Sequence, residues 1–312
     1  MILSNDISVV VQGPIHTQDN LTKRVLESVR THLPDAELIL STWKGSDVDG
    51  LDYDILLLND DPGPLNVPNK SKINLNRQIV STRNGLQKAT RTYAMKLRTD
   101  TLLTGTGFID AFDKYPERRE DFKVFEHKVI IPTLYTKNPL QPFPGLIHFF
   151  HPSDIFQFGL KRDLLLLWNI PNATEVDVRS IFSEQYVWTH CLKSSSENIN
   201  FSLLNLKEKL LISEISLFNN FVIDTPSNLG IKYPPHLLNQ MKSICYSKNE
   251  IKRLFERYIV HHSNSLPIRS ILALPLIYLL ELIKEYRLNT GLGIHLINLY
   301  EKINRTKYQQ TL

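Results

Sequence analysis

The sequence predicts an α/β protein in which a mixed, mainly parallel sheet is flanked by helices and followed by a helical C-terminal extension. Short apolar runs rich in Val, Ile and Leu alternate with segments whose apolar residues recur at three- and four-residue steps. The runs end in polar residues or Gly-Pro, and the chain becomes basic and helical in pattern from Asn249 onward. Alternating strands and helices are typical of parallel sheets with right-handed crossovers.

The elements before residue 100 carry most of the functional signal. The expected strands are Ile7–Gln12, Glu37–Ser41, Asp54–Leu58 and Tyr93–Leu97, and the expected helices are Asn20–His32 and a central helix that carries Ile79 and Leu86. Later in the chain we expect helices at Gly105–Tyr115 and Ile181–Leu192, strands at Lys128–Pro132 and Phe218–Ile223, and a strand followed by a helix at Ile155–Trp168. The carboxyl ends of parallel strands form the edge where α/β sheets bind ligands.

The composition is that of a globular protein with a large core, since 42% of the 312 residues are hydrophobic and 22% are charged. We expect a catalytic domain at residues 1–240 and a helical basic extension at 241–312. Two cysteines, Cys191 and Cys245, are too few for a disulfide framework and suit a reducing compartment as core thiols. No signal peptide precedes the first strand, and no apolar run reaches the ~20 residues of a membrane span. A cytoplasmic protein is therefore expected.

The basic excess lies in the C-terminal part of the chain. Residues 248–312 hold ten Lys or Arg and five Asp or Glu, whereas residues 1–247 are nearly neutral. A local excess favours an anionic surface over nucleic acid as a partner. Within it, Ile271–Ile283 is the most apolar stretch and is flanked by Arg269, Lys284 and Arg287. It predicts either a helix on the inner face of the cytoplasmic membrane or a buried helix that packs on the catalytic domain or a second copy.

The stretch 73–103 resembles known families. Gly85–Ala89 matches the Gly-Ile-x-x-Ala helix end of inverting, GT-A-type nucleotide-sugar glycosyltransferases, Tyr93 follows four residues later, and Arg98–Asp100 stands where those enzymes have Asp-x-Asp. The segments VVVQGP, ILSTW, NRQIVSTRNGL and KLRTD, over roughly residues 6–190, resemble the WavE-type lipopolysaccharide-synthesis proteins. The resemblance implies a GT-A fold and transfer of a sugar from a nucleotide-sugar donor to a glycan or lipid-linked glycan acceptor. The product would be lipopolysaccharide core, O-antigen or capsule.

The same resemblance implies a divalent cation, Mg²⁺ or Mn²⁺, at Asp100, with Arg98 in place of the first aspartate of the motif. Mg²⁺ commonly uses one or two carboxylates together with phosphate oxygens. An arginine at this position can also bind a diphosphate bidentately. The alternative is an incidental ion pair at the end of a strand.

Nucleotide-sugar contacts are expected from the first three strand ends and the central helix. Gln12, Gly13 and Pro14 offer an amide, a backbone that permits close approach, and a fixed φ. The other candidates each have a structural alternative: Thr42 and Trp43 flank the base or lie in the core, Asp60 and Asp61 hold the base or ribose or form a turn, and Arg77 reaches the diphosphate or lies on the surface.

The catalytic base is expected at the start of a late helix. Ser183-Glu184-Gln185 resembles the Glu-Asp pair of inverting enzymes, with glutamine where the usual base stands. Glu184 and Asp154 are both candidates to take the proton of the acceptor hydroxyl, and capping of a helix or turn is the alternative for each. A retaining mechanism becomes the expectation if neither is the base. His148 and His151, in an expected loop at 143–153, are further candidates for a metal or the acceptor sugar, and the resemblance makes His236 a candidate metal ligand.

Two functions from other classes stay open. A non-catalytic scaffold that binds nucleotide sugar or polysaccharide would explain the replaced aspartate and the Glu-Gln pair. A sugar-nucleotidyltransferase would carry a Gly-rich loop with Arg and Lys after the first strand, and Gln12–His16 has no such loop.

Overall fold

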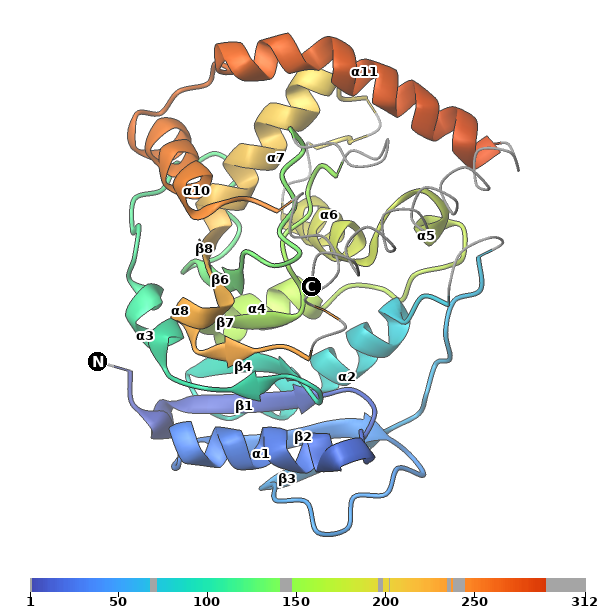
Figure 1. Ribbon diagram of the computed structural model, residues 1–312, viewed down its shortest axis with the longest axis vertical. Coiled ribbons are helices and arrows are strands. Elements are labelled where there is room, and N and C mark those ends of the chain that lie inside the picture. Colours follow the sequence, from blue (N-terminus) through green and yellow to red (C-terminus); the bar gives the residue numbers. More distant parts are fainter. Residues whose placement is uncertain are drawn as a thin grey trace, which may run out of the picture.

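The computed structural model describes residues 2–67, 72–140, 148–195, 199–201, 203–234, 237 and 245–289. Its centre is a seven-stranded sheet with the order β3-β2-β1-β4-β7-β6-β8 (Figure 1). The strands are β1 (Ile7–Gln12), β2 (Glu37–Trp43), β3 (Ile55–Asn59), β4 (Tyr93–Arg98), β6 (Val129–Pro132), β7 (Phe156–Leu160) and β8 (Phe221–Asp224). β3, β2, β1 and β4 are parallel, β7 is antiparallel to β4 and β6, and β8 is parallel to β6. The predicted fold class is confirmed.

Apolar side chains on both faces explain the parallel arrangement of the first strands. All residues of β1 are buried, as expected for a β-branched strand that is covered on both sides. Val9 and Val11 belong to one hydrophobic cluster and Val10 to the other, because successive side chains alternate between the faces of a strand.

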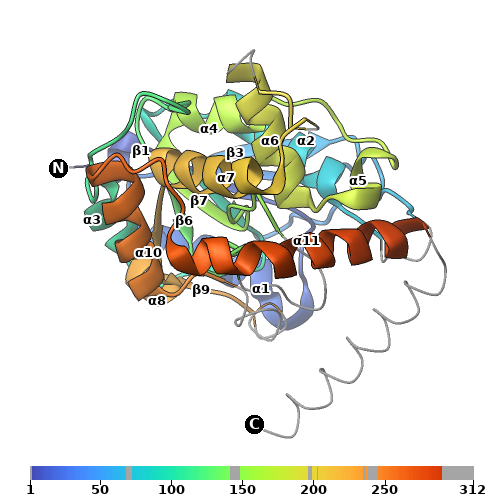
Figure 2. The same cartoon turned by 90° about the horizontal axis from the view of Figure 1, so that it is seen from above.

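Helices cover both faces of the sheet (Figures 1 and 2). The helices on the Val9 face are α1 (Leu21–His32) and α3 (Gly107–Phe112), and those on the Val10 face include α2 (Leu75–Lys88), α4 (Lys161–Trp168), α6 (Ser183–Ser195) and α7 (Leu206–Asn220). The smaller elements are η1 (Ser4–Asp6), η2 (Gln18–Asn20), α5 (Asp177–Ser180), α8 (Pro226–Leu229), and a two-stranded sheet of β5 (Leu102–Leu103) and β9 (Ile231–Lys232).

The central helix α2 crosses β1 at very short range. A Cβ atom at Gly85 would lie 2.3 Å from Cγ1 of Val10, so this position accepts no side chain without movement of the core. The glycine that carries part of the sequence resemblance is therefore needed for packing.

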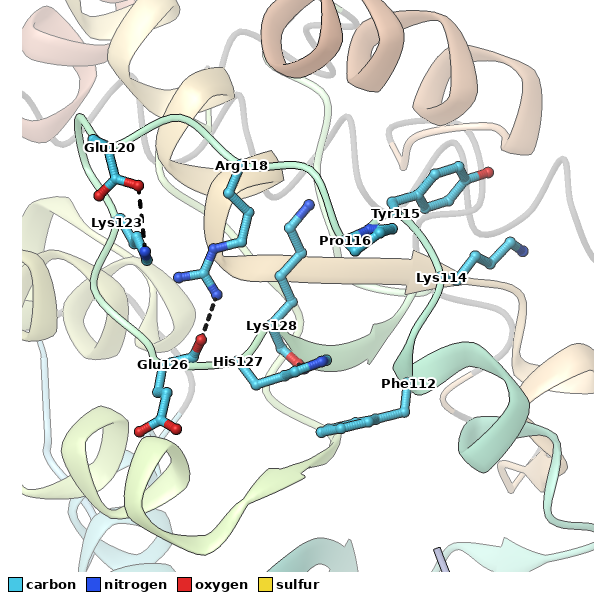
Figure 3. A pocket seen from close by; sticks show the side chains of 10 residues that line it. All are labelled: Phe112, Lys114, Tyr115, Pro116, Arg118, Glu120, Lys123, Glu126, His127 and Lys128. Carbon is cyan, nitrogen blue, oxygen red and sulfur yellow. Dashed lines mark hydrogen bonds and ion pairs between the residues drawn. The ribbon is translucent and has the colours of Figure 1, made fainter. Parts of the chain in front are cut away.

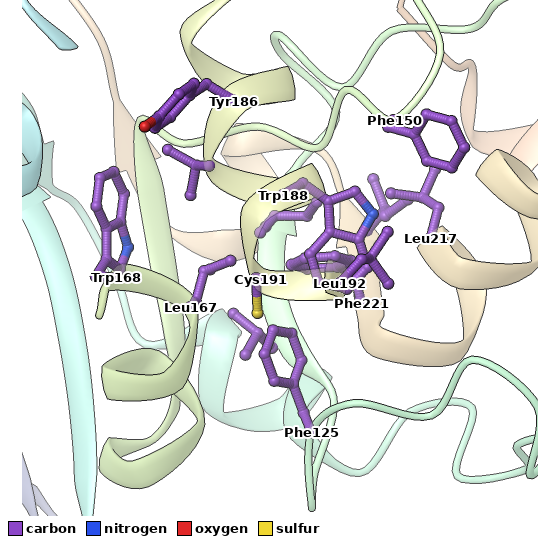
Figure 4. Close-up of a cluster of buried hydrophobic side chains, with 14 of the residues drawn as sticks. Phe125, Phe150, Leu167, Trp168, Tyr186, Trp188, Cys191, Leu192, Leu217 and Phe221 are labelled. Carbon is purple, nitrogen blue, oxygen red and sulfur yellow. The ribbon is translucent and has the colours of Figure 1, made fainter. Parts of the chain in front are cut away.

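An aromatic core lies beneath α4, α6 and α7 (Figure 4). The rings of Phe125, Trp188 and Phe221 contact one another with centroid separations between 4.9 and 5.7 Å. Cys191 is buried beside them, and burial raises the pKa of its thiol to about 12. Cys245 is also a buried free thiol, which agrees with the prediction of two core cysteines.

One predicted element was partly wrong. The strand expected at Phe218–Ile223 is β8, which begins at Phe221, and Phe218 lies in the last turn of α7. The sequence analysis missed this helix, although Asn205 and Glu208 form a capping box at its start.

The described part of the C-terminal extension packs on α7. It consists of α10 (Lys248–Phe255), a π-helical turn η4 (Glu256–Val260) and α11 (Ile268–Asn289), and Figure 2 shows α11 lying across the molecule. Phe255 and Ile277 join the same hydrophobic cluster as Val10. A domain boundary at residue 240 stays a prediction, but the described residues on its two sides share one core. Among the described helices, none is both long and apolar enough to span a membrane.

Candidate active site

The ends of β1 and β4 lie side by side and are joined by Thr99. Gln12 and Arg98 are register partners. The amide of Thr99 donates to the carbonyl of Gln12 at 3.1 Å, and its hydroxyl donates to the carbonyl of Pro14 at 2.7 Å. Gly13 has a φ of +126°, and a Cβ there would lie 3.0 Å from the Thr99 hydroxyl. Glycine thus permits the tight turn that brings residues 12–14 beside Arg98.

Other candidates at the first two strand ends are largely buried. The side-chain carbonyl of Gln12 accepts a hydrogen bond from Ser81 of α2 at 2.7 Å, so this amide holds the helix against the strand. Thr42 and Trp43 are the last residues of β2, and both are buried. Their predicted contact with a base stays a prediction, while the structure bears out the alternative of a core tryptophan.

Asp60 and Asp61 follow β3 and have different partners. Asp61 accepts two hydrogen bonds from Arg77 of α2, at 2.7 and 2.5 Å, and these bonds hold the pKa of Asp61 below its ordinary value. Asp60 is exposed and pairs with Lys44 at 2.8 Å. Arg77 therefore positions Asp61 at the rim of the site, and a role for either residue in donor binding stays a prediction.

Arg98 and Asp100 form a bidentate pair at the end of β4. The Nε and Nη2 atoms of Arg98 donate to the two carboxylate oxygens of Asp100 at 2.8 and 2.7 Å. Only 2% of the Asp100 side chain and 25% of the Arg98 side chain are exposed. Burial works to lower the pKa of Arg98, but the hydrogen bonds and the charge of Asp100 together raise it. A fixed guanidinium thus lies at the edge where the sheet is expected to bind its ligand.

The two candidate bases, Glu184 and Asp154, lie in one electrostatic cluster with this pair. Asp154 precedes β7 and is buried, and its Oδ2 atom has no hydrogen-bond partner among the described residues. Glu184 is in the first turn of α6, and 13% of its side chain is exposed. Burial, followed by the charge of Asp154, raises the pKa of Glu184 to about 7. A carboxyl with this pKa can accept a proton near neutral pH.

Two buried lysines surround the carboxyls. Lys96, in the middle of β4, donates to the carbonyl of Asp154 and lies 4.5 Å from the ring centroid of Trp168. Lys137 lies 4.2 Å from the ring centroid of Phe182. Burial lowers the pKa of each lysine to about 8. Their positive charges favour the ionised form of Glu184, in opposition to its burial.

His151 faces Glu184 from the preceding loop. Its Nδ1 lies 3.0 Å from the carbonyl of Tyr135, and its Nε2 lies 3.5 Å from Oε2 of Glu184. Burial keeps its pKa well below the ordinary value, so the ring is neutral. Because a carbonyl only accepts, the proton is on Nδ1 and Nε2 is left as an acceptor toward Glu184. His148 packs edge-on against His151, whereas His236 lies outside the described residues.

The sequence analysis did not identify the two lysines or a buried tyrosine of this cluster. Tyr233 is 2% exposed, and its hydroxyl has no hydrogen-bond partner among the described residues. Burial raises its pKa well above the ordinary value, and the charges of Arg98, Asp154 and Asp100 also act on it. One signal was present, because a lysine in the otherwise apolar run YAMKL is unusual for a buried strand. Lys137 and Tyr233 have no such local signal.

The donor set of the described residues does not fit a metal ion held by the protein alone. Both oxygens of Asp100 already accept hydrogen bonds from Arg98. In the described part of the chain, no three His, Cys, Asp or Glu side chains are grouped so that they could hold a metal ion.

Comparison with known proteins decides the family. The family model for WavE lipopolysaccharide synthesis matches residues 7–274. The chain belongs to this family. The matched residues include the ends of β1 and β4, with Arg98 and Asp100, which we call the strand-end site. Membership of the family supports the predicted role in lipopolysaccharide synthesis. This WavE family member also has some likeness to a crystal structure of the galactosyltransferase LgtC in complex with donor and acceptor sugar analogues. The two are 9% identical, the match covers 84% of this chain and 98% of LgtC, and the TM-score is 0.36. None of the curated proteins matches the chain.

Proposed function

We propose that the protein is a GT-A-type glycosyltransferase that moves a sugar from a nucleotide-sugar donor to a lipopolysaccharide glycan. The observation that carries the proposal is the buried Arg98–Asp100 pair at the joined ends of β1 and β4, beside two carboxyls of which one has a pKa near neutrality. Glycosyl transfer needs a cation for the departing diphosphate and a base for the acceptor hydroxyl. Family membership supports a glycan as the acceptor.

Arg98 supplies the positive charge at the leaving group. Asp100 fixes its guanidinium through two hydrogen bonds, and a quarter of the Arg98 side chain is exposed and can contact a diphosphate. A planar guanidinium suits phosphate oxygens, and a preorganised cation stabilises charge as the bond from the anomeric carbon to the diphosphate breaks. Because both oxygens of Asp100 accept hydrogen bonds from Arg98, this mechanism assigns the diphosphate to the guanidinium and routes no step through a metal ion.

Glu184 acts as the base. The acceptor hydroxyl gives its proton to the Glu184 carboxylate while its oxygen forms the new bond to the anomeric carbon, so the products are the extended glycan and a nucleoside diphosphate. The neutral ring of His151 places an acceptor nitrogen beside this carboxyl, which favours the protonated form that the reaction produces. A single displacement of this kind inverts the anomeric centre. Asp154, which is almost fully buried, balances the charges of Lys96 and Arg98.

A thermal-shift screen with UDP-, GDP-, CMP- and dTDP-sugars, each with and without Mn²⁺, tests the proposal. A ligand that binds the native state raises its melting temperature. We expect one nucleotide class to stabilise the protein without metal, and release of the matching nucleoside diphosphate when acceptor is added. Stabilisation only with Mn²⁺ would overturn the assignment of the diphosphate to Arg98 and support the predicted metal at Asp100. Binding without turnover would favour the scaffold function.

We propose further that α11 lies on an anionic membrane surface, where a lipid-linked acceptor is found. One stripe of this helix is apolar and exposed, with side chains 46–76% accessible, and consists of Ile268, Leu272, Leu276, Leu279, Leu282 and Tyr286. Arg269 lies beside the stripe and is exposed. Apolar side chains on one face of a helix next to basic residues favour binding to the interface of an anionic bilayer.

Sedimentation with vesicles tests this orientation. We expect the full chain to sediment with vesicles of phosphatidylglycerol and to stay in solution with phosphatidylcholine. Leu272→Gln combined with Leu279→Gln should abolish binding, whereas the matched pair Val176→Gln and Leu203→Gln, also exposed but outside α11, should retain it. Retained binding in the α11 variant would refute the proposal. A change only in its oligomeric state would assign the stripe to a second copy.

A further inference from the structure

A cavity of about 340 Å³ lies beside the segment that leads into β6 (Figure 3). It is lined by the segment between α3 and β6, from Phe112 to Lys128. β4 and β6 are both antiparallel to β7, so they run in the same direction. Arg98 is the last residue of β4, whereas Lys128 comes just before the first residue of β6. The two residues therefore lie at opposite ends of strands that run in the same direction. The cavity is separate from the strand-end site.

Two cations in this cavity form no ion pair among the described residues. Lys128 is 2% exposed, and its Nζ atom donates to the carbonyl of Glu117 at 3.1 Å and lies 4.2 Å from the ring centroid of Phe255. Arg118 donates to the carbonyls of Glu126 and Phe125, and its buried Nε has no hydrogen-bond partner there. The two side chains lie next to each other (Figure 3). Only neutral oxygens and an aromatic face therefore receive their hydrogen bonds and contacts.

The carboxylates around the cavity are already engaged. Glu126 pairs with Arg162, and Glu120 pairs with Lys123 at 3.4 Å. Asp163, which is close enough to act on Arg118, accepts from the amides of Glu126 and His127, both at 2.9 Å. Three carboxylates act on the two cations through their charge, Glu117 on Lys128 and both Asp163 and Glu120 on Arg118, but none of the three forms an ion pair with either cation.

The unfavourable burial of Lys128 and Arg118 changes the pKa of both side chains. Burial, followed by the charge of Arg118, lowers the pKa of Lys128 to about 7, and burial also lowers the pKa of Arg118. Burying charges without a partner is unfavourable unless a ligand supplies one. An anion between Lys128 and Arg118 would remove the penalty for both.

We propose that this cavity binds the phosphate group of a sugar phosphate or of a phosphorylated glycan. A phosphate monoester carries nearly two negative charges at neutral pH and can balance both cations, whereas a carboxylate can balance one. The free Nε of Arg118 and the ammonium of Lys128 are the donors for its oxygens. The volume is at the lower end of the range for ligand sites and suits a single sugar unit. His127, whose ring stacks on that of buried Phe112 with the centroids 3.7 Å apart, and Tyr115 are the partly exposed aromatic side chains of the lining.

The melting temperature of the full chain in inorganic phosphate, in glucose 1-phosphate and in chloride of equal ionic strength tests the proposal. We expect both phosphates to raise it with the logarithm of their concentration, and chloride to have no effect. A larger rise with glucose 1-phosphate identifies a sugar phosphate as the ligand. An equal rise identifies free phosphate and removes the sugar from the proposal. No rise with either compound overturns it.

Variants then locate the phosphate. Lys128→Met and Arg118→Gln should each lower the affinity for phosphate about tenfold or more, as expected for the loss of a charge-assisted hydrogen bond. Lys207→Met, the same change at an exposed position of α7, should leave the affinity for phosphate unchanged. Lys128→Met should also melt no lower than the parent without phosphate, because it removes a buried charge that has no ion-pair partner among the described residues. A lower melting temperature with an unchanged phosphate response would make Lys128 a structural residue and refute the site.

Phosphate bound at the strand-end site is excluded by a further variant, Arg98→Met combined with Asp100→Asn. The response to phosphate should persist in this double variant, since the cavity is separate from the strand-end site. A response lost there and kept in Lys128→Met would overturn the proposal. The same comparison separates it from the proposed glycosyl transfer, whose failure would leave the phosphate response intact.

Discussion

Replacing Arg98 by methionine removes the guanidinium that holds both oxygens of Asp100. The remaining carboxylate is 2% exposed and would lose both hydrogen bonds from the guanidinium. Breaking a buried ion pair from one side costs about 3–5 kcal/mol, and the partial exposure of Arg98 suggests about 3 kcal/mol here. For a protein of this size such a loss lowers the melting temperature by roughly 5 °C. Differential scanning calorimetry of Arg98→Met measures this directly.

The double variant Arg98→Met, Asp100→Asn separates stability from chemistry. It leaves no unpaired charge, so most of the lost stability should return. Turnover should not return, because the cation for the departing diphosphate is still missing, and the rate of nucleoside diphosphate release should stay about 10²–10³ below the parent. Near-parental turnover in the double variant would refute the role of Arg98 in catalysis.

A matched pair on the surface controls for the stability argument. Arg77 and Asp61 have the same bidentate geometry, but their side chains are 32% and 37% exposed. Arg77→Met should therefore cost less than about 1 kcal/mol. Equal losses from Arg77→Met and Arg98→Met would show that burial of Asp100 does not determine the cost.

Three further predictions concern other buried groups. Turnover should rise with pH through about 7 as Glu184 loses its proton, and Glu184→Gln should abolish this rise in the pH–rate profile without weakening donor binding in the thermal-shift assay. Burial raises the pKa of Glu214 to about 7, so the native state binds this proton more tightly than the unfolded state, and stability falls as pH rises from about 4.5 through 7. Glu214→Gln should remove this loss and raise the free energy of unfolding by up to about 3 kcal/mol at pH 8. Denaturant titration should find no such gain at pH 4. Gly85→Ala should lower the free energy of unfolding by about 1–3 kcal/mol, because the new methyl group would lie against Val10, and unchanged denaturation would refute the close crossing of α2.

The charge environment of Glu184 links these results. Two lysines and a neutral histidine lie around it, and the lysines oppose the effect of burial on its pKa. Lys137→Met should therefore shift the rising limb of the pH–rate profile to higher pH. A limb that stays in place would mean that Lys137 does not act on the base.

The elements of the N-terminal half and the residues at their ends could be predicted from the sequence alone. Ile7–Gln12 is β1 with the predicted bounds, and Arg98 and Asp100 lie at the end of β4 as expected. These features are local, since a short apolar run followed by polar residues specifies a buried strand and its end. The family resemblance also rests on these local segments.

Which side chains meet at the site depends on the tertiary structure and could not be predicted from the sequence. The insertion of β7 antiparallel to β4 brings Asp154 beside Lys96, and the start of α6 brings Glu184 to His151. These contacts join residues far apart in the chain, so no local pattern encodes them. The absence of ion pairs at Lys128 and Arg118 could not be predicted for the same reason, because the positions of the carboxylates around them depend on the whole fold. Local sequence patterns specify the strands and the residues at their ends, whereas long-range packing determines which charged groups lie near those residues.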